Sequence, residues 1–280
     1  MNNINKYSKF IKLEHTLFSF PIVLAGSFLA ARGVPPFHLL ILILLAAAGA
    51  RTAAMGLNRI IDRKIDSLNP RTKDRELPSG EVSMKEGYAI TGFGLGLYFA
   101  SCYLICNLVF HLSPIPLIIF ILYPYMKRFT PFCHFGVGLA LAFAPLGGWV
   151  AVTCSLNGLL APILLALFTL FWVSGFDIIY ATLDEKFDIE YKIYSMVSVY
   201  GREKALRISA VCHIVAFLSL VVVYFISFSN IYSGIVLLLV GLLLFLEHRK
   251  SSNVDLAFFK INILVGGAVF LFIICGIYLN

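Results

Sequence analysis

Residues 38–66 read HLLILILLAAAGARTAAMGLNRIIDRKID, an apolar run that ends in polar side chains spaced four residues apart. An apolar run of this kind is long enough to cross a hydrocarbon core about 30 Å thick, which takes roughly 20 helical residues. Asn58, Asp62 and Asp66, here called the first motif, would lie on one face of the same helix, since residues four apart stack along a helix surface. The stretch therefore predicts a membrane helix that carries an amide and two carboxylates at one end.

Comparable apolar runs recur along the whole chain. Of its 280 residues, 60% are hydrophobic and only 13% are charged, which is too little polar surface to cover a water-soluble globule. We therefore predict an all-α fold in one domain, 1–280, a polytopic membrane bundle of nine transmembrane helices. The expected spans are 16–32, 38–61, 88–111, 115–126, 133–152, 159–184, 203–228, 231–247 and 256–279.

The basic residues indicate how this bundle is oriented. If the N-terminus is cytoplasmic, eighteen of the 22 lysines and arginines lie in cytoplasmic segments and only Arg32 lies in an outside loop. Cytoplasmic segments retain basic residues, so the bias supports that orientation in the inner (cytoplasmic) membrane. The same rule and anionic lipid headgroups account for most of the net charge of +7, so we expect no nucleic-acid partner.

A second acidic segment, DIIYATLDEKFD, occupies residues 177–188. Asp177, Asp184 and Asp188 are spaced to share one helix face, with Tyr180 beside them, and these four residues are here called the second motif. Carboxylates on one face repel each other, so a cation is expected between them. Magnesium prefers hard oxygen ligands and is often held by one or two carboxylates together with substrate phosphates.

The alternative is that the acids only solvate a cytosolic loop or pair with neighbouring basic residues. Two copies of the motif favour a site, as does the place of Asp177 in an apolar helix, since intramembrane acids are costly and usually functional. Cationic and phenolic side chains suited to phosphate oxygens surround both motifs. We take as candidates Arg59, Arg63, Arg71, Lys73, Tyr123, Lys127, Arg128 and Lys192.

Arg51 lies seven residues before Asn58 and is expected on the same helix face, deeper in the membrane. An arginine there is costly unless it meets an anion, and its planar guanidinium matches a carboxylate bidentately. We predict that Arg51 binds a carboxylate of the substrate, with His15 as a second candidate for the same pocket. A structural ion pair between Arg51 and Asp177 is the alternative.

The chain resembles the UbiA superfamily of intramembrane prenyltransferases over nearly its whole length. The similarity is most specific in NRIIDRKID with NPRTKDRELPSG, in YPYMKR and in GFDIIYATLDEKFD, and the opening FIKLEHTLFSFP resembles the 4-hydroxybenzoate polyprenyltransferase-like branch. This resemblance implies that the two motifs bind a magnesium diphosphate under a cytosolic-side cap. Asp62, Asp66, Asp184 and Asp188 would be metal ligands, and Asn58, Asp177 and Tyr180 would complete the catalytic set. Residues 189–201 depart from the basic, proline-containing pattern of that branch.

The resemblance implies transfer of a polyprenyl group to an aromatic acid, 4-hydroxybenzoate or a dihydroxynaphthoate, in ubiquinone or menaquinone biosynthesis. The expected partners are the polyprenyl diphosphate, the acceptor and the bilayer, with no obligatory protein partner. An ion-coupled transporter or channel is the competing class, because intramembrane acids often line ion paths. A transporter would place its acids near the membrane midplane, whereas here all but Asp177 fall near the cytosolic interface.

Overall fold

The computed structural model describes residues 3–12, 16–251 and 260–279, and within these ranges the chain forms helices and no strands. The helices are α1 (Asn3–Phe10), α2 (Thr16–Ala31), α3 (Phe37–Leu68), α4 (Met84–Ile105), α5 (Asn107–Leu112), α6 (Pro114–Met126), α7 (Cys133–Thr153), α8 (Leu160–Ala181), α9 (Glu185–Glu190), α10 (Met196–Tyr200), α11 (Arg202–Ser227), α12 (Ile231–Arg249) and α13 (Asn262–Tyr278).

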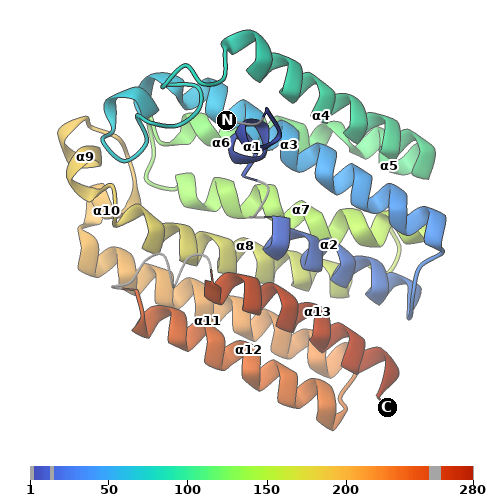
Figure 1. The fold of residues 1–280 in the computed structure, drawn as a ribbon. Helices are drawn as coiled ribbons and strands as arrows, with labels where there is room; N and C mark the ends of the chain where they lie inside the picture. The colour runs from blue at the N-terminus through green and yellow to red at the C-terminus, as the bar shows by residue number, and fades with distance from the viewer. Residues whose placement is uncertain (1–2, 13–15, 252–259, 280) are drawn as a thin grey trace.

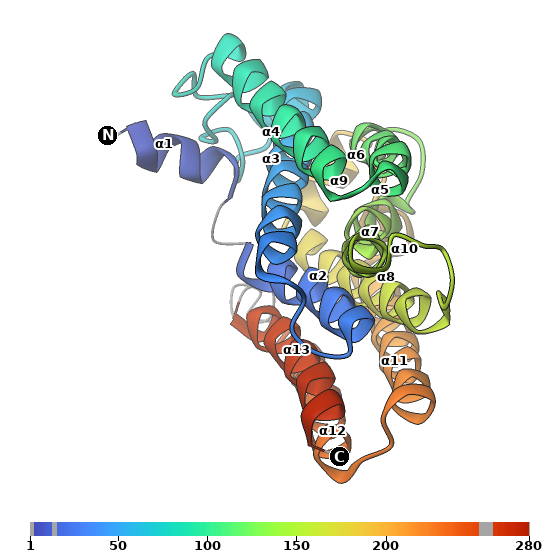
Figure 2. The ribbon, with the colours of Figure 1, turned by 90° about the vertical axis from the view of Figure 1, so that its right-hand side faces the viewer.

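Long apolar helices lie side by side and form the body of the molecule (Figures 1 and 2). In the described part of the chain, seven helices are long and apolar enough to cross a membrane, with α5 and α6 counted together as one span. Two shorter apolar helices, Ser19–Ala31 and Asn262–Tyr278, run beside them. Trp172 and Phe168 of α8 are fully buried in the largest hydrophobic cluster, which α2, α8, α11, α12 and α13 build together.

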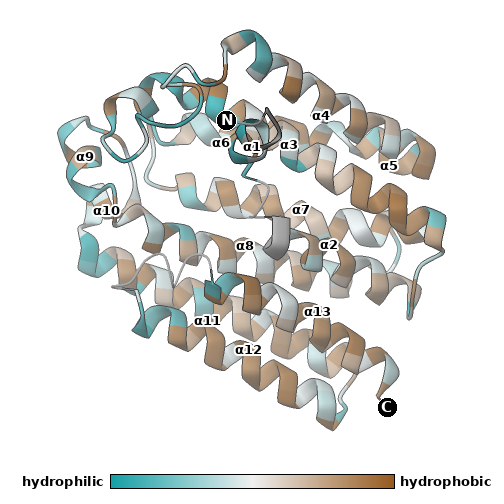
Figure 3. Cartoon of the chain, viewed as in Figure 1, coloured by the Kyte–Doolittle hydropathy of each residue, from teal (hydrophilic) through white to brown (hydrophobic). Residues whose placement is uncertain are grey.

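Polar segments gather at one end of this bundle. The loop between α3 and α4 lies at that end with α9 and α10, and the hydrophilic colouring is densest there (Figures 1 and 3). Helix α1 packs on the loop through Phe10, which is fully buried against Leu77 and Val82. The Lys6 ammonium lies 2.7 Å from a carboxylate oxygen of Glu86 at the start of α4. Both motifs emerge at this end.

Helix α3 is longer than the span 38–61 that the sequence predicts, because the first motif continues the helix to Leu68. Asn58, Asp62 and Asp66 therefore share one helix, as their spacing predicts. The predicted span 88–111 is wrong as one helix, since Cys106 takes an extended conformation that separates α4 from α5. The short span 115–126 corresponds to α6 and is continued backwards by α5.

The second motif does not lie on one helix face, contrary to its spacing. Helix α8 ends at Ala181, before the predicted boundary at 184, and residues 182–184 form a tight turn whose N–H groups bond to carbonyls three residues back. The Thr182 hydroxyl donates to the Ile179 carbonyl at 2.7 Å, a local bond that competes with continued helix. Asp184 is consequently the residue that precedes α9, and Asp188 lies within α9.

Candidate functional site

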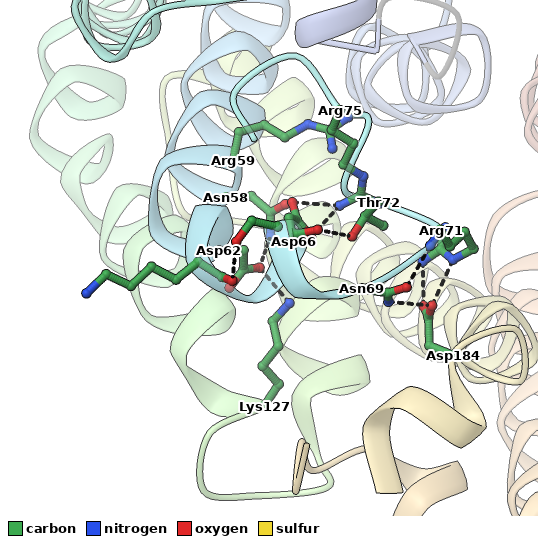
Figure 4. Close-up of polar contacts among 12 residues, drawn as sticks. Asn58, Arg59, Asp62, Asp66, Asn69, Arg71, Thr72, Arg75, Lys127 and Asp184 are labelled. Atoms are coloured by element: carbon green, nitrogen blue, oxygen red, sulfur yellow. Dashed lines mark hydrogen bonds and ion pairs between the residues drawn. The ribbon is translucent and has the colours of Figure 1, made fainter. Parts of the chain in front are cut away.

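Asp62 is the most enclosed carboxylate of the first motif, with a side chain only 2% exposed. Asn58 Nδ2 donates to its Oδ2 at 3.2 Å, and the Lys127 ammonium lies 2.6 Å from the same oxygen. Arg128 reaches Asp62 Oδ1 at 3.5 Å while it donates to the Pro124 carbonyl at 2.8 Å. Figure 4 shows Lys127 reaching from the α6 end towards the first motif. The YPYMKR segment thus lies against the first motif.

Asp66, one turn further along α3, binds a different cation. One nitrogen of Arg75 donates to both carboxylate oxygens, at 2.8 and 2.9 Å, and the Thr72 hydroxyl donates to the Asp66 backbone carbonyl at 2.9 Å (Figure 4). Arg59 is 2% exposed and lies 4.0 Å from Glu76 in the same loop. The loop after α3 therefore folds back over the helix that precedes it.

Asp184 joins the second motif to that loop. Asn69 Nδ2 and Arg71 Nε both donate to its Oδ1 at 2.8 Å, and a second Arg71 nitrogen pairs with Oδ2 (Figure 4). Arg71 also donates to the Tyr180 hydroxyl at 2.7 Å and lies over the Tyr180 ring. Burial alone would raise the pKa of Asp184, but the bonds from Arg71 and Asn69 hold that pKa below its ordinary value.

Asp188 is buried in α9. Burial raises the pKa of Asp188 to about 6, and the nearby charge of Asp184 acts in the same direction while a hydrogen bond from Ser195 opposes it. No three acidic, histidine or cysteine side chains among the described residues are gathered closely enough to hold a metal ion. Asp62, Asp66 and Asp184 are each held by basic side chains in this arrangement.

Asp177 belongs to a different contact, deeper in the bundle. Its Oδ2 lies 2.7 Å from His134 Nδ1 in the first turn of α7, so the partner that the structure gives Asp177 is His134 rather than Arg51. Helices α7 and α8 approach closely one turn further on, at Gly138. This approach requires glycine, since a Cβ there would collide with the Leu170 carbonyl oxygen. Arg51 points one nitrogen at the Lys12 carbonyl, 3.4 Å away.

A cavity of about 540 Å³ lies beside these groups. Of the two motifs, Asn58, Asp177 and Tyr180 line it, whereas Asp62, Asp66, Asp184 and Asp188 do not. Its wall carries polar side chains from both motifs and from the α3–α4 loop: Arg51, Asn58, Arg59, Arg75, Tyr123, Asp177 and Tyr180. The remaining lining is largely apolar and extends along α3 and α7 to Ile105, Val109, Leu156 and Leu159. The cavity is therefore polar on one side and hydrocarbon-like over the rest of its length.

Three predicted phosphate-binding residues lie away from these contacts. Arg63, Lys73 and Lys192 are exposed, and Lys192 has the left-handed backbone conformation, with φ 55°. His15 falls outside the described residues. The structure brings the remaining basic candidates and Tyr123 to the motifs or to the cavity wall.

Asn69 and His134 were not among the predicted site residues, and Thr72 was likewise missed. Asn69 lies three residues after Asp66, and residues three apart also share a helix face, so extending the pattern of the first motif could have identified Asn69 as a candidate. His134 is an ionisable residue at the start of an apolar helix, directly after the basic segment at Lys127 and Arg128, and intramembrane ionisable groups are usually functional. Arg75 lies in the NPRTKDRELPSG segment, but its pairing with Asp66 has no sequence signal.

Comparison with known proteins gives a consistent result. Residues 19–264 match the UbiA prenyltransferase family. A 4-hydroxybenzoate octaprenyltransferase of Aliivibrio fischeri (strain MJ11) is 30% identical over 247 residues, which cover 87% of this chain and 85% of that protein. The corresponding enzyme of a Marinomonas species is 33% identical over 216 residues, 72% of each chain.

Solved structures agree with the fold. A UbiA homologue from Aeropyrum pernix K1 superimposes with a TM-score of 0.82 at 32% identity, covering 95% of this chain and 98% of that one. A UbiA homologue from Archaeoglobus fulgidus bound to GPP and Mg2+ has a TM-score of 0.73 at 19% identity, over 96% and 99% of the two chains. At that identity the second likeness concerns the fold alone.

Proposed function

The chain belongs to the UbiA prenyltransferase family and is a multi-pass membrane prenyltransferase, and from this premise we propose which substrates its site takes. The donor is a polyprenyl diphosphate with magnesium, and the acceptor is an aromatic acid, 4-hydroxybenzoate or a dihydroxynaphthoate. The reaction serves ubiquinone or menaquinone biosynthesis. Membership of this family favours the enzyme over the transporter that intramembrane acids also suggest.

The observation that carries the proposal is the shape and chemistry of the cavity. Its polar side is lined by Asn58 of the first motif and by Asp177 and Tyr180 of the second, next to the place proposed for a diphosphate, and its long apolar part suits a hydrocarbon chain. Ligand sites are mostly apolar with a few placed polar groups, and this cavity follows that rule. A polyprenyl chain already dissolved in the bilayer would enter such a space without crossing water.

The acidic residues fit a magnesium ion. The Oδ1 atom of Asp62 is buried without a hydrogen-bond donor, and Arg128 approaches it only to 3.5 Å. A hard oxygen left in that state is suited to a hard cation. Asp62, Asp66, Asp184 and Asp188 would hold the ion, which would neutralise charge on the diphosphate.

The basic residues would then change partners. Lys127, Arg71 and Arg75 now balance Asp62, Asp184 and Asp66, and a cation bound to those carboxylates would free them for phosphate oxygens. Breaking the allylic carbon–oxygen bond gives an allylic cation and a diphosphate anion, so positive groups that meet the developing negative charge promote the step. Arg59 lines the cavity and Arg128 lies 3.5 Å from Asp62, so both are near enough to the proposed diphosphate site to share this role.

Aromatic faces would stabilise the allylic cation. Tyr123, Phe176 and Tyr180 line the cavity, and a desolvated cation over an aromatic ring gains about 2 kcal/mol or more. Two neighbouring aromatic residues do not line the cavity: Trp172 is fully buried in the core and Tyr125 is 43% exposed. Excluding water from this part of the site protects the cation from hydrolysis.

The acceptor would lie between the diphosphate and the apolar chain. We propose that Arg51 binds its carboxylate, because a planar guanidinium in the cavity wall matches that group bidentately. The electron-rich ring attacks the allylic carbon, a carbon–carbon bond forms, and the ring proton must then leave. Asp177 is the carboxylate in the same wall that can accept this proton, which leaves prenylated acid and diphosphate as products.

For the membrane arrangement we propose nine crossings in one domain, 1–280, with α2 and α13 added to the seven longer spans. The N-terminus and both motifs face the cytoplasm of the inner membrane, on the evidence of the basic residues. The loop after α3, with α9 and α10, forms a cytosolic-side cap over the site. The common position of these segments at the polar end supports this reading (Figure 3).

The experiment is to incubate membranes containing the protein with a long-chain polyprenyl diphosphate and a panel of aromatic acids, and to identify products by mass. We expect one acid to gain the prenyl mass, and chelation of magnesium with EDTA to abolish the product. Membranes without the protein are the control. Turnover that survives complete chelation would contradict the metal assignment, and no product with any acid would contradict the proposed acceptor class.

A further inference from the structure

His134 joins two parts of the site that are far apart in the sequence. It is 4% exposed in the first turn of α7, and its two ring nitrogens have different partners. Nδ1 lies 2.7 Å from Asp177 in α8, and Nε2 lies 3.3 Å from the backbone nitrogen of Met196 at the start of α10. A single imidazole therefore contacts a cavity residue and the segment that follows the second motif.

These contacts determine the tautomer. A backbone N–H can only donate, so Nε2 must accept from Met196 and carry no proton. The ring proton is then on Nδ1 and is donated to the Asp177 carboxylate. The imidazole does not need a positive charge to make both bonds, and each bond fixes the orientation required for the other.

The Met196 amide is itself held in place. Ser195 caps α10 through a reciprocal pair of bonds with Ser198, and the Met196 side chain is 2% exposed among Ile178, Val197 and Ala205. The N–H of Met196 belongs to the first turn of α10, where helix geometry supplies no internal acceptor. His134 supplies that acceptor, so the position of residues 195–200 and the orientation of His134 depend on each other.

We propose that His134 is a positioning residue that fixes the Asp177 carboxylate in the cavity wall and ties it to the start of α10. This inference rests on the proposed function, in which Asp177 accepts the ring proton of the acceptor. The cavity wall at Asp177 is thereby linked to the segment 189–201, which departs from the pattern of the related branch. His134 touches neither substrate and acts through Asp177.

Substitutions can separate the two bonds. His134→Ala removes both, whereas His134→Gln offers one donor and one acceptor and should restore part of the activity. Met196→Pro removes the N–H, and so only the second bond, together with the methionine side chain. Proline is tolerated at the first helical position, and the extended backbone of Ser195 is compatible with a following proline. Met196→Ala is the matched control, because it keeps the N–H and loses the same side chain.

We expect His134→Ala to lower kcat by roughly 10- to 100-fold, the range for groups that orient a reacting residue, with the KM for polyprenyl diphosphate within about twofold of the unmodified enzyme. Met196→Pro should lower kcat several-fold relative to Met196→Ala. In a His134→Ala background, the proline and alanine variants should be equal, since the bond is already absent. A proline effect of the same size in both backgrounds would overturn the link, as would a loss confined to the KM for diphosphate.

Hydrogen exchange tests the link without any substrate. In detergent-purified protein, the peptide spanning residues 191–200 should exchange faster in His134→Ala than in the unmodified chain, with His134→Gln between them. Unchanged exchange in His134→Ala would refute the inference even if turnover falls. An unmodified enzyme that exchanges as expected but converts no aromatic acid would contradict the proposed function and leave the link supported.

Discussion

Asp62 lies in α3 and Asp184 in the turn before α9, yet each carboxylate is held by a lysine or arginine that a diphosphate would also attract. In the proposed mechanism, exchange of these partners would keep the charges balanced before and after substrate binding. Asparagine has nearly the same shape as aspartate but carries no negative charge to offset that of a bound metal ion. Asp62→Asn and Asp184→Asn should therefore each lower turnover by roughly 100-fold or more. Product formation at saturating magnesium, with membrane insertion checked separately, measures the effect.

Asp74→Asn is the control for these variants, because Asp74 is an exposed acid of the nearby α3–α4 loop. It should retain the activity of the unmodified enzyme. Near-normal turnover in either Asp62→Asn or Asp184→Asn would show that one motif suffices for diphosphate binding.

Arg51 gives a second prediction at this scale. Removal of a hydrogen bond to a charged group costs about 1.5–3 kcal/mol, so Arg51→Ala should raise the acceptor KM by roughly 10- to 100-fold. The KM for polyprenyl diphosphate should stay nearly constant, which is the pattern of lost binding to one substrate. Arg51→Lys keeps the charge without the bidentate fork and should be intermediate. Equal losses for both substrates would instead indicate a structural role for Arg51.

Between elements, a polar contact ties α8 to α12 and α13. Trp172 Nε1 donates to Asn262 Oδ1 at 2.6 Å, and Asn262 Nδ2 donates to Glu247 Oε1 at 3.0 Å, with Glu247 and Asn262 fully buried. Asn262→Leu keeps the branching at Cγ, with a larger side chain, but removes both bonds, which should cost about 1–3 kcal/mol for each polar group left in the core. The thermal midpoint in detergent should fall by several degrees, at roughly 2–4 °C per kcal/mol.

Leu264 serves as the control for the same helix, since it is 57% exposed on α13. Leu264→Ala should change the midpoint little, because substitutions away from the packed core usually have small effects. A midpoint in Asn262→Leu equal to that of Leu264→Ala would mean that the contact adds nothing to helix association.

The elements also mark what the sequence could predict. Apolar runs located the membrane helices, and i, i+4 spacing placed the first motif on α3, because both signals depend on residues close in the chain. The turn at residues 182–184 and the break at Cys106 contain neither glycine nor proline, which are the strongest local signals of a helix end. The His134 contact with Asp177 and the Arg75 contact with Asp66 depend on how distant segments pack, which periodicity does not encode.

At the scale of the whole molecule, all polar loops that bear the motifs lie at one end of the bundle, while the α7–α8 connection lies at the other (Figure 1). This arrangement and the bias of basic residues together predict sidedness. Ser67 and Glu203 are exposed at the motif end, and Asn157 is exposed in the α7–α8 connection. Ser195 is less suitable as a reporter, because it is buried and caps α10.

Single cysteines at Ser67, Glu203 and Asn157, on a background without the six native cysteines, provide the final test. In intact cells an impermeant maleimide should label Asn157→Cys and leave Ser67→Cys and Glu203→Cys unlabelled. After permeabilisation all three should react, which controls for accessibility. Labelling of Ser67→Cys but not of Glu203→Cys would place the motifs on opposite faces, and a single diphosphate could then not contact both. Labelling of both, with Asn157→Cys protected, would instead keep one site but reverse the orientation of the bundle.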